Sequence, residues 1–196
     1  MSDGLLTQAI KQAETWLGEA KREMVPEYNA MTLSTASAKG RVMARTVLLK
    51  SLDEDGFVFF TNTLSRKGRQ ILENPAVALT FFWMPLYRQI LVEGHAIPVS
   101  DEEADAYWET RERASQLGGL ASLQSQTLDS RETLENRLKY FEDKYANQQV
   151  PRPKHWSGYR VVPNRIEFWQ GQSHRLHDRE VYTFDGQKWS TERLYP

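Results

Sequence analysis

Apolar residues recur at helical spacing near the start of the chain and in short alternating runs over much of the remainder. Within residues 1–25, Leu6, Ala9, Ile10, Ala13, Leu17 and Ala20 recur at helical spacing. Their spacing predicts an amphipathic N-terminal helix. Runs rich in β-branched and aromatic residues then predict strands, separated by turn signals such as Asp185-Gly186. The predicted strands are residues 31–35, 42–49, 57–61, 77–83, 89–97, 159–162, 165–169, 179–184 and 188–193.

Three further helices are predicted, over residues 65–73, over residues 100–111 and from about residue 130. Ser100 and Glu103 form a capping box at the start of the second. Strands outnumber helices and are joined by connections of hairpin length. This pattern favours a mainly β protein with flanking helices, in which an antiparallel barrel or strongly curled sheet carries the helices outside. We expect residues 26–196 to form a single domain with helices inserted at about 100–145.

Composition narrows the possible partners. The 196 residues carry a formal net charge of −1, which gives no support for nucleic acid or an acidic membrane as a partner. The chain contains no cysteine, and its four histidines lack carboxylates at ligand spacing, so no metal site is predicted. No segment resembles a signal peptide or a membrane span, so we expect a cytoplasmic protein. Because the net charge is close to zero, any anion-binding site must be formed by a local cluster of cations.

Two such clusters lie beside predicted strands. Residues 45–50 form a strand with a cation at each end, although strict alternation would place Arg45 and Lys50 on opposite faces. Ser65 can cap a helix whose first turn holds Arg66 and Lys67. Cations at that position oppose the helix dipole unless an anion is bound. An ordinary exposed basic surface is the alternative interpretation of both clusters.

A third cluster consists of Tyr107, Arg111 and Ser115, which are spaced four residues apart. If the helix continues through all three, they form one polar stripe able to grip a phosphate through a guanidinium and two hydroxyl groups. An ordinary solvated helix face is the alternative. The run Ser122 to Gln126 that follows is polar and, taken alone, indicates a loop.

The most informative segment is residues 169–179. Arg175, His177 and Arg179 stand at every second position, so an extended backbone would point all three to one face. Two guanidiniums and an imidazole there would suit a phosphate-bearing ligand, and Trp169 would offer a face for an aromatic ring. The alternative is a solvated edge strand.

Taken together, these clusters resemble the pyridoxamine (pyridoxine) 5′-phosphate oxidases. The matching segments, in family order, are R-T-V-L-L-K at 45–50, F-T-N-T-L-S-R-K at 60–67, Y-W-E-T-R-E-R-A-S-Q-L-G at 107–118, Q-S at 124–125 and F-W-Q-G-Q-S-H-R-L-H-D-R at 168–179. The resemblance covers about residues 30–196. It implies an FMN-binding split β-barrel and a homodimer with FMN in the subunit interface.

The resemblance also implies an activity and its residues. The reaction would be FMN-dependent oxidation of pyridoxine or pyridoxamine 5′-phosphate to pyridoxal 5′-phosphate, with O2 as acceptor and hydrogen peroxide as product. Lys50, Tyr107, Arg111 and Ser115 would grip the substrate phosphate, and the catalytic residues Arg175 and His177 would hold its pyridine ring. The implied FMN-binding residues are Arg45, Thr46, Val47, Leu48, Leu49, Lys50, Phe60, Thr61, Arg66, Lys67, Gln89, Gln124, Ser125, Trp169 and Arg179.

Two departures from the family pattern leave alternatives open. Phe60 stands where the family more often has tyrosine, and the first helix shows no match to the Arg- and Tyr-containing segment that family members usually carry. One alternative is a different flavin oxidoreductase on the same scaffold, against which the Tyr107, Arg111 and Ser115 stripe argues. The other is a non-catalytic carrier of FMN or pyridoxal 5′-phosphate, which would have less use for Arg175 and His177.

Overall fold

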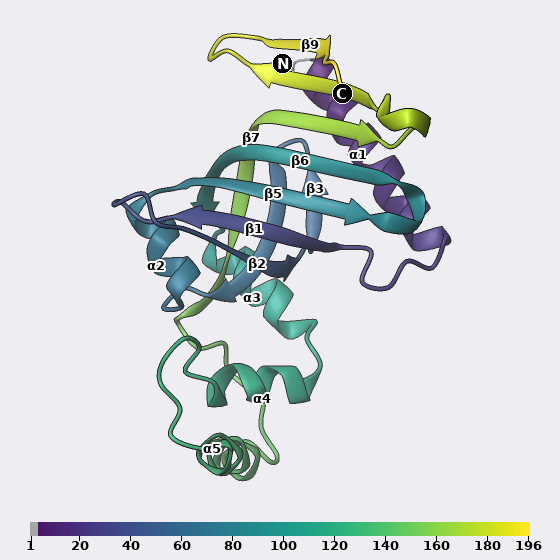
Figure 1. Ribbon diagram of the computed structural model, residues 1–196. Helices are drawn as coiled ribbons and strands as arrows, with labels where there is room; N and C mark the ends of the chain where they lie inside the picture. Colours follow the sequence, from purple (N-terminus) through teal and green to yellow (C-terminus); the bar gives the residue numbers. More distant parts are fainter. Residues whose placement is uncertain (1–3) are drawn as a thin grey trace.

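The computed structural model describes residues 4–196, whose centre is one strongly curled antiparallel sheet (Figure 1). Residues 1–3 of the predicted segment 1–25 lie outside the described residues. The strands are β1 Ala30–Ala36, β2 Val42–Leu48, β3 Ser51–Asp53, β4 Gly56–Asn62, β5 Ala76–Trp83, β6 Arg88–Pro98, β7 Trp156–Gln170, β8 Asp178–Phe184 and β9 Trp189–Arg193. The helices are α1 Gly4–Arg22, α2 Arg66–Glu73, α3 Asp101–Glu109, α4 Arg113–Ala121 and α5 Arg131–Lys144, with 3₁₀ turns η1 Met84–Leu86 and η2 Ser173–Arg175.

Strand β7 organises the sheet. One of its edges pairs with β6 over most of its length, while the other pairs first with β4 and then with β8. The sheet order is β2-β1-β5-β6-β7-β4-β3, with β8 and β9 added beyond the second half of β7. All the pairings are antiparallel, which confirms the predicted fold class.

The prediction of two separate strands at 159–162 and 165–169 was wrong, because β7 is continuous. Pro163 interrupts the strand pattern in the sequence, but it lies where the neighbour on one edge changes from β4 to β8. A missing N–H is tolerated there because that edge has no partner to accept it. The register with β6 shifts at Gly94, where a Cβ atom would lie 2.2 Å from the carbonyl oxygen of Val162. A glycine at this bulge lets the two backbones approach closely.

Helix α1 covers the main core, as its periodicity predicts. Ala9, Ile10, Ala13, Leu17 and Ala20 are buried and belong to the same apolar cluster as the large side chains of the sheet. Small alanines on the buried stripe allow the helix to approach the sheet closely. Most of its charged residues are exposed, while Glu19 forms an ion pair with Arg88 of the sheet. Burial of the apolar stripe therefore holds this helix in place, together with that pair.

Helices α3, α4 and α5 form a smaller unit at the opposite end of the molecule from the β8–β9 hairpin (Figure 1). Their apolar cluster is built around Trp108, Leu117, Val150 and Trp156. Helix α4 and the short strand β3 were not predicted from the sequence. The predicted helix over residues 100–111 ends at Glu109, and α4 begins at Arg113 after Glu112 adopts an extended conformation with ψ 139°.

Candidate functional site

A cavity of about 400 Å³ lies between β2, β4, the start of α2 and α4. Its cationic lining residues are Lys50, Lys67 and Arg111, and no carboxylate is among the described residues that line it. We call this cavity the basic pocket. The predicted residues that line it are Thr46, Val47, Leu48, Lys50, Phe60, Thr61, Lys67, Arg111, Ser115 and Gln124. The structure therefore brings together residues from three of the clusters identified in the sequence.

Lys67 is held by hydroxyl and amide oxygens instead of a carboxylate. Its Nζ donates to Thr61 Oγ1 at 3.0 Å, Ser65 Oγ at 3.2 Å and Gln124 Oε1 at 2.9 Å. Burial, and to a smaller extent the positive charge of Arg45, lower the pKa of Lys67 to about 8. A nearby anion would offset both effects, because it favours the charged form of the lysine.

The start of α2 has the predicted cap. The Ser65 side chain accepts a hydrogen bond from the Gly68 N–H, and the backbone N–H of Arg66 donates to Ser125 Oγ at 3.2 Å. Gly68 permits this turn to pack tightly, since a Cβ atom there would lie 2.1 Å from the Thr63 carbonyl oxygen. The first turn contains no acidic residue. The positive end of the helix dipole and the charges of Arg66 and Lys67 therefore both make the electrostatic potential at the start of α2 more positive.

Cations around the pocket lack acidic partners. Within residues 4–196, no ion pair with a carboxylate involves Arg45, Lys50, Arg66, Lys67 or Arg111. Burying cations in part without a nearby negative charge destabilises the folded protein, and a bound anion would remove this unfavourable free energy. This charge distribution is typical of a phosphate site.

Arg111 lies at the corner between α3 and α4. The helix does not continue through all three residues of the stripe: the Thr110 hydroxyl donates to the Tyr107 carbonyl oxygen, and α3 ends at Glu109. The corner still brings Arg111 to Ser115, whose carbonyl oxygen accepts from Arg111 Nη2 at 3.2 Å. Arg111 Nε is buried without a partner among the described residues, and burial lowers the pKa of this guanidinium.

Tyr107 lies beside the pocket and does not line it. Its ring stacks on Phe60, with centroids 4.1 Å apart, and Lys50 Nζ lies 5.8 Å from the Tyr107 ring centroid. Arg45 is also outside the lining. Its Nη1 donates to Thr35 Oγ1 at 2.7 Å, and its pKa is lowered by burial and by Arg66. Leu49 is buried in the main core.

The remaining predicted residues gather at the other end of β7. Gln89, Trp169 and Arg179 are neighbours across β6, β7 and β8, because Gln89 pairs with Trp169 and Trp169 pairs with Arg179. The His177 ring centroid lies 4.6 Å from that of Trp169. Together with Arg175, these residues form what we call the distal cluster.

Residues 169–179 are not extended throughout, so the condition for one shared face is not met in the middle of the segment. Residues 173–175 form the turn η2, in which His174 and Arg175 have φ values of 59° and 63°. The turn is closed locally, since the Gln172 N–H donates to His177 Nδ1 at 3.1 Å. These local bonds compete with extended backbone, so Arg175, His177 and Arg179 do not follow one strand face.

Arg179 is tied to Glu167, which the sequence analysis did not identify. Glu167 is 2 % exposed, and it accepts from Arg179 Nε at 2.8 Å and from Arg165 Nη2 at 2.7 Å. Burial alone would raise the pKa of Glu167, but the two arginines outweigh it and hold the pKa below its usual range. A lone glutamate between Ile166 and Phe168 in a buried strand was the available signal.

The basic pocket and the distal cluster lie far apart in one chain. Trp156, which lines the pocket, begins β7, and Trp169 stands near its end. At about 3.3 Å per residue, this stretch of strand would span roughly 40 Å if straight. Figure 1 shows α4 and α5 at one end of the molecule and the β8–β9 hairpin at the other. A single chain therefore does not assemble all the predicted site residues.

Two family descriptions match the chain. Residues 17–145 match the family described as "Pyridoxamine 5'-phosphate oxidase", and residues 156–196 match "Pyridoxine 5'-phosphate oxidase C-terminal dimerisation region". A "Pyridoxine/pyridoxamine 5'-phosphate oxidase" of Rubrobacter xylanophilus is 53% identical over 99% of this chain and 89% of that protein. The protein of that name from Acaryochloris marina is 51% identical over 95% of this chain and 85% of that protein.

Solved structures share the fold. The structure of PhzG from Burkholderia lata, in complex with tetrahydrophenazine-1-carboxylic acid, superimposes with a TM-score of 0.92 at 33% identity. The superposition covers 100% of this chain and 94% of the PhzG chain. An FMN-binding protein from Nostoc punctiforme has a TM-score of 0.74 at 18% identity, over 94% and 96% of the two chains. No helix within residues 4–196 is both long and apolar enough to cross a membrane.

Proposed function

The chain belongs to the pyridoxamine 5′-phosphate oxidase family of oxidoreductases, and from this we propose that it converts pyridoxine and pyridoxamine 5′-phosphates to pyridoxal 5′-phosphate with bound FMN. The observation that carries the proposal is the basic pocket, whose three cations face no carboxylate among the described residues. The buried, unpartnered Nε of Arg111 adds a donor that fits a phosphate oxygen. FMN and the substrate each carry one phosphate.

We assign the two phosphates to different parts of the site: one to the pocket and the adjoining start of α2, the other to the α3–α4 side of the pocket. Arg66 and Lys67 at the start of α2 would hold the FMN phosphate, where the helix dipole also favours an anion. Lys50, Arg111 and Ser115 would hold the substrate phosphate, with Tyr107 alongside. When bound, FMN would accept the electrons from the substrate's C4′ carbon and pass them to O2, giving hydrogen peroxide.

The distal cluster would complete the site from a second copy of the chain. In a homodimer, the basic pocket of one protomer would face the distal cluster of its partner, with FMN between them. The match of residues 156–196 to a dimerisation region supports this arrangement, as does the separation of the two clusters within one chain. Arg175 and His177 would then orient the pyridine ring, and Gln89, Trp169 and Arg179 would contact FMN. The protein would contribute to the rate by holding the reacting groups in the correct orientation.

An anaerobic titration tests the proposed function. FMN-loaded protein is mixed with pyridoxine 5′-phosphate while the visible flavin absorption is followed. We expect the band to bleach and to return when air is admitted, with pyridoxal 5′-phosphate formed. A flavin band unchanged by either B6 phosphate would refute the proposal. Bleaching by a phosphate-free tetrahydrophenazine carboxylic acid instead would favour an activity on the ligand type of the PhzG complex.

The lowered pKa of Lys67 predicts how FMN binding depends on pH. The free lysine loses its proton above about pH 8, and bound phosphate would favour the charged form. We therefore expect the Kd for FMN to rise about tenfold between about pH 7 and about pH 9, a range in which the phosphate stays doubly charged. Quenching of flavin fluorescence measures this directly. In Lys67→Arg the charge persists, so its Kd should stay nearly flat. An equal rise in both proteins would exclude Lys67 as the cause.

A further inference from the structure

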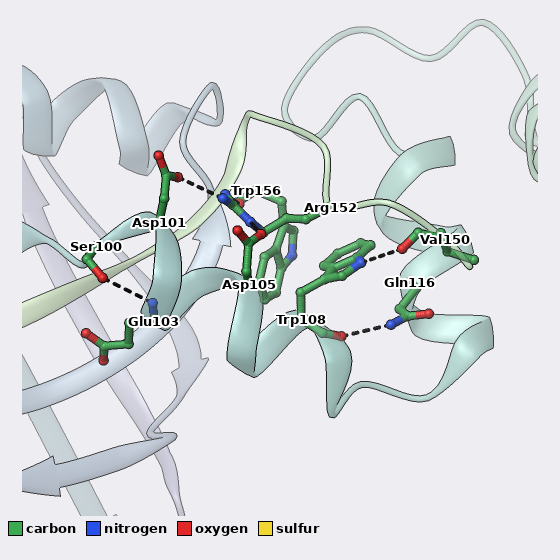
Figure 2. A network of polar contacts seen from close by, with 9 residues as sticks. All are labelled: Ser100, Asp101, Glu103, Asp105, Trp108, Gln116, Val150, Arg152 and Trp156. Carbon is green, nitrogen blue, oxygen red and sulfur yellow. Dashed lines mark hydrogen bonds and ion pairs between the residues drawn. The ribbon is translucent and has the colours of Figure 1, made fainter. Parts of the chain in front are cut away.

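Arg152 joins three parts of the structure next to the basic pocket (Figure 2). It lies in the connector between α5 and β7, and its side chain is 10% exposed. Its Nη2 bonds to Asp101 at 2.7 Å and its Nε to Asp105, both on α3. Its Nη1 donates to the carbonyl oxygen of Trp156, the first residue of β7, at 2.9 Å. Arg152 therefore fixes the start of β7 against α3.

The Arg111 guanidinium packs against the indole ring of Trp156. The Arg111 guanidinium lies 4.8 Å from a Trp156 ring centroid. Three other rings lie against the indole: Phe60, stacked at 5.4 Å, Tyr107, stacked at 6.0 Å, and Trp108, edge-on at 4.8 Å. A cation held over a desolvated indole is stabilised, and its direction depends on where the ring lies.

The corner that carries Arg111 is fixed to the same connector. Trp108 Nε1 donates to the Val150 carbonyl at 2.8 Å, and Gln116 Nε2 donates to the Trp108 carbonyl at 2.8 Å (Figure 2). Arg111 itself has one hydrogen bond to the protein, to the Ser115 carbonyl, among those described. Its placement thus depends mainly on the indole of Trp156 and on this corner.

We infer that Arg152 is a positioning residue for the substrate phosphate, acting through Trp156 to aim Arg111 into the basic pocket. Arg152 has no place in the pocket lining, so it acts without touching the ligand. The inference rests on the proposed function, because it needs Arg111 to bind the substrate phosphate.

Arg160 provides a matched control. It also lies on the α3 side of the sheet, is 16% exposed, and forms ion pairs with Asp53 and with Glu103 of α3. It differs from Arg152 in making no described hydrogen bond to Trp156. If Arg152 merely stabilised the packing of α3, replacing Arg160 would have the same effect on the pocket.

The experiment measures pyridoxal 5′-phosphate binding by tryptophan fluorescence, together with kcat and KM, in FMN-loaded protein. We expect Arg152→Met to weaken ligand binding and raise KM about tenfold, with kcat and FMN affinity nearly unchanged. Arg152→Lys should recover part of the loss, and Arg160→Met should leave ligand binding close to wild type. In an Arg111→Ala background, Arg152→Met should add almost nothing, because both changes remove one grip.

Three results would overturn the inference: an unchanged affinity in Arg152→Met, equal losses in Arg152→Met and Arg160→Met, or full additivity with Arg111→Ala. If Arg152→Met does not fold, Asp105→Asn and Glu103→Gln give the same comparison, since each removes one α3 partner. Only the first should then weaken ligand binding. If the wild-type protein binds no pyridoxal 5′-phosphate, the proposed function itself is refuted. If the wild-type protein binds it and one of the three results above is obtained, only the role of Arg152 is refuted.

Discussion

Replacing Arg175 by alanine is expected to lower kcat by about two to three orders of magnitude while FMN content stays at the wild-type level. Arg175 is exposed on the turn η2, and within residues 4–196 its side chain has no described hydrogen bond or ion pair. A permanently charged side chain that has no described partner in its own chain is available to a substrate held by the other protomer. Its loss should therefore affect the orientation of the substrate and not the folding of the turn.

The adjacent residue offers the control for this measurement. His174 is exposed on the same turn and has a similar positive φ of 59°, so His174→Ala imposes the same kind of backbone change. We expect His174→Ala to retain most of the wild-type kcat. Steady-state rates at saturating substrate and flavin absorbance of the purified proteins decide the matter. Wild-type turnover in Arg175→Ala would remove Arg175 from the site.

Replacing Arg111 by alanine should instead act on binding. Hydrogen bonds to a charged group contribute about 1.5–3 kcal/mol each, so the loss of one is expected to raise KM about 10-fold to 150-fold. The phosphate is remote from the reacting carbon, so kcat should change by no more than a few-fold. The affinity for pyridoxal 5′-phosphate should fall in parallel with the rise in KM.

Arg113 is the matched control for Arg111. It stands two residues later, at the start of α4, and its guanidinium donates to the carbonyl oxygens of Gln148 and Tyr145 outside the basic pocket. Arg113→Ala should leave KM close to wild type. An unchanged KM in Arg111→Ala, or an equal rise in both variants, would show that Arg111 does not hold the phosphate.

The sequence predicted the parts of this fold that depend on local pattern. The stripe from Ala9 to Ala20 and the strands with clear alternation were correct, because burial of one face specifies both. The cap at Ser65 was also correct, since capping requires a few adjacent residues.

The sequence did not predict features that depend on tertiary contacts. Pro163 is compatible with a continuous β7 because the strand's neighbour changes there. The Tyr107 to Ser115 stripe bends at Thr110, yet the bend itself places Arg111 beside Ser115. Glu167 binds Arg179, which lies 12 positions later in the sequence. Arg152 acts on Arg111, which lies 41 positions earlier. Periodicity carries no information about contacts at such separations.

The separation of the site into two clusters was equally absent from the sequence pattern. The basic pocket is lined by residues between Thr46 and Gln124 together with Trp156, and the distal cluster consists of Gln89 and residues from the segment 169–179. Strand β7 holds the two apart within one chain. The resemblance supplied the homodimer that would bring them together. The separation of the two clusters within one chain gives a physical reason to expect that assembly.

A mixed dimer tests the shared site most directly. Arg111→Ala and Arg175→Ala chains are co-expressed with different tags, and the heterodimer is assayed at substrate concentrations well below the wild-type KM. If each site combines the basic pocket of one protomer with the distal cluster of the other, one site in the heterodimer is intact and the other carries both defects. We expect about half the wild-type activity, as two-fold symmetry requires. Activity no higher than that of the two parent variants would show that each site lies within one chain and would contradict the account.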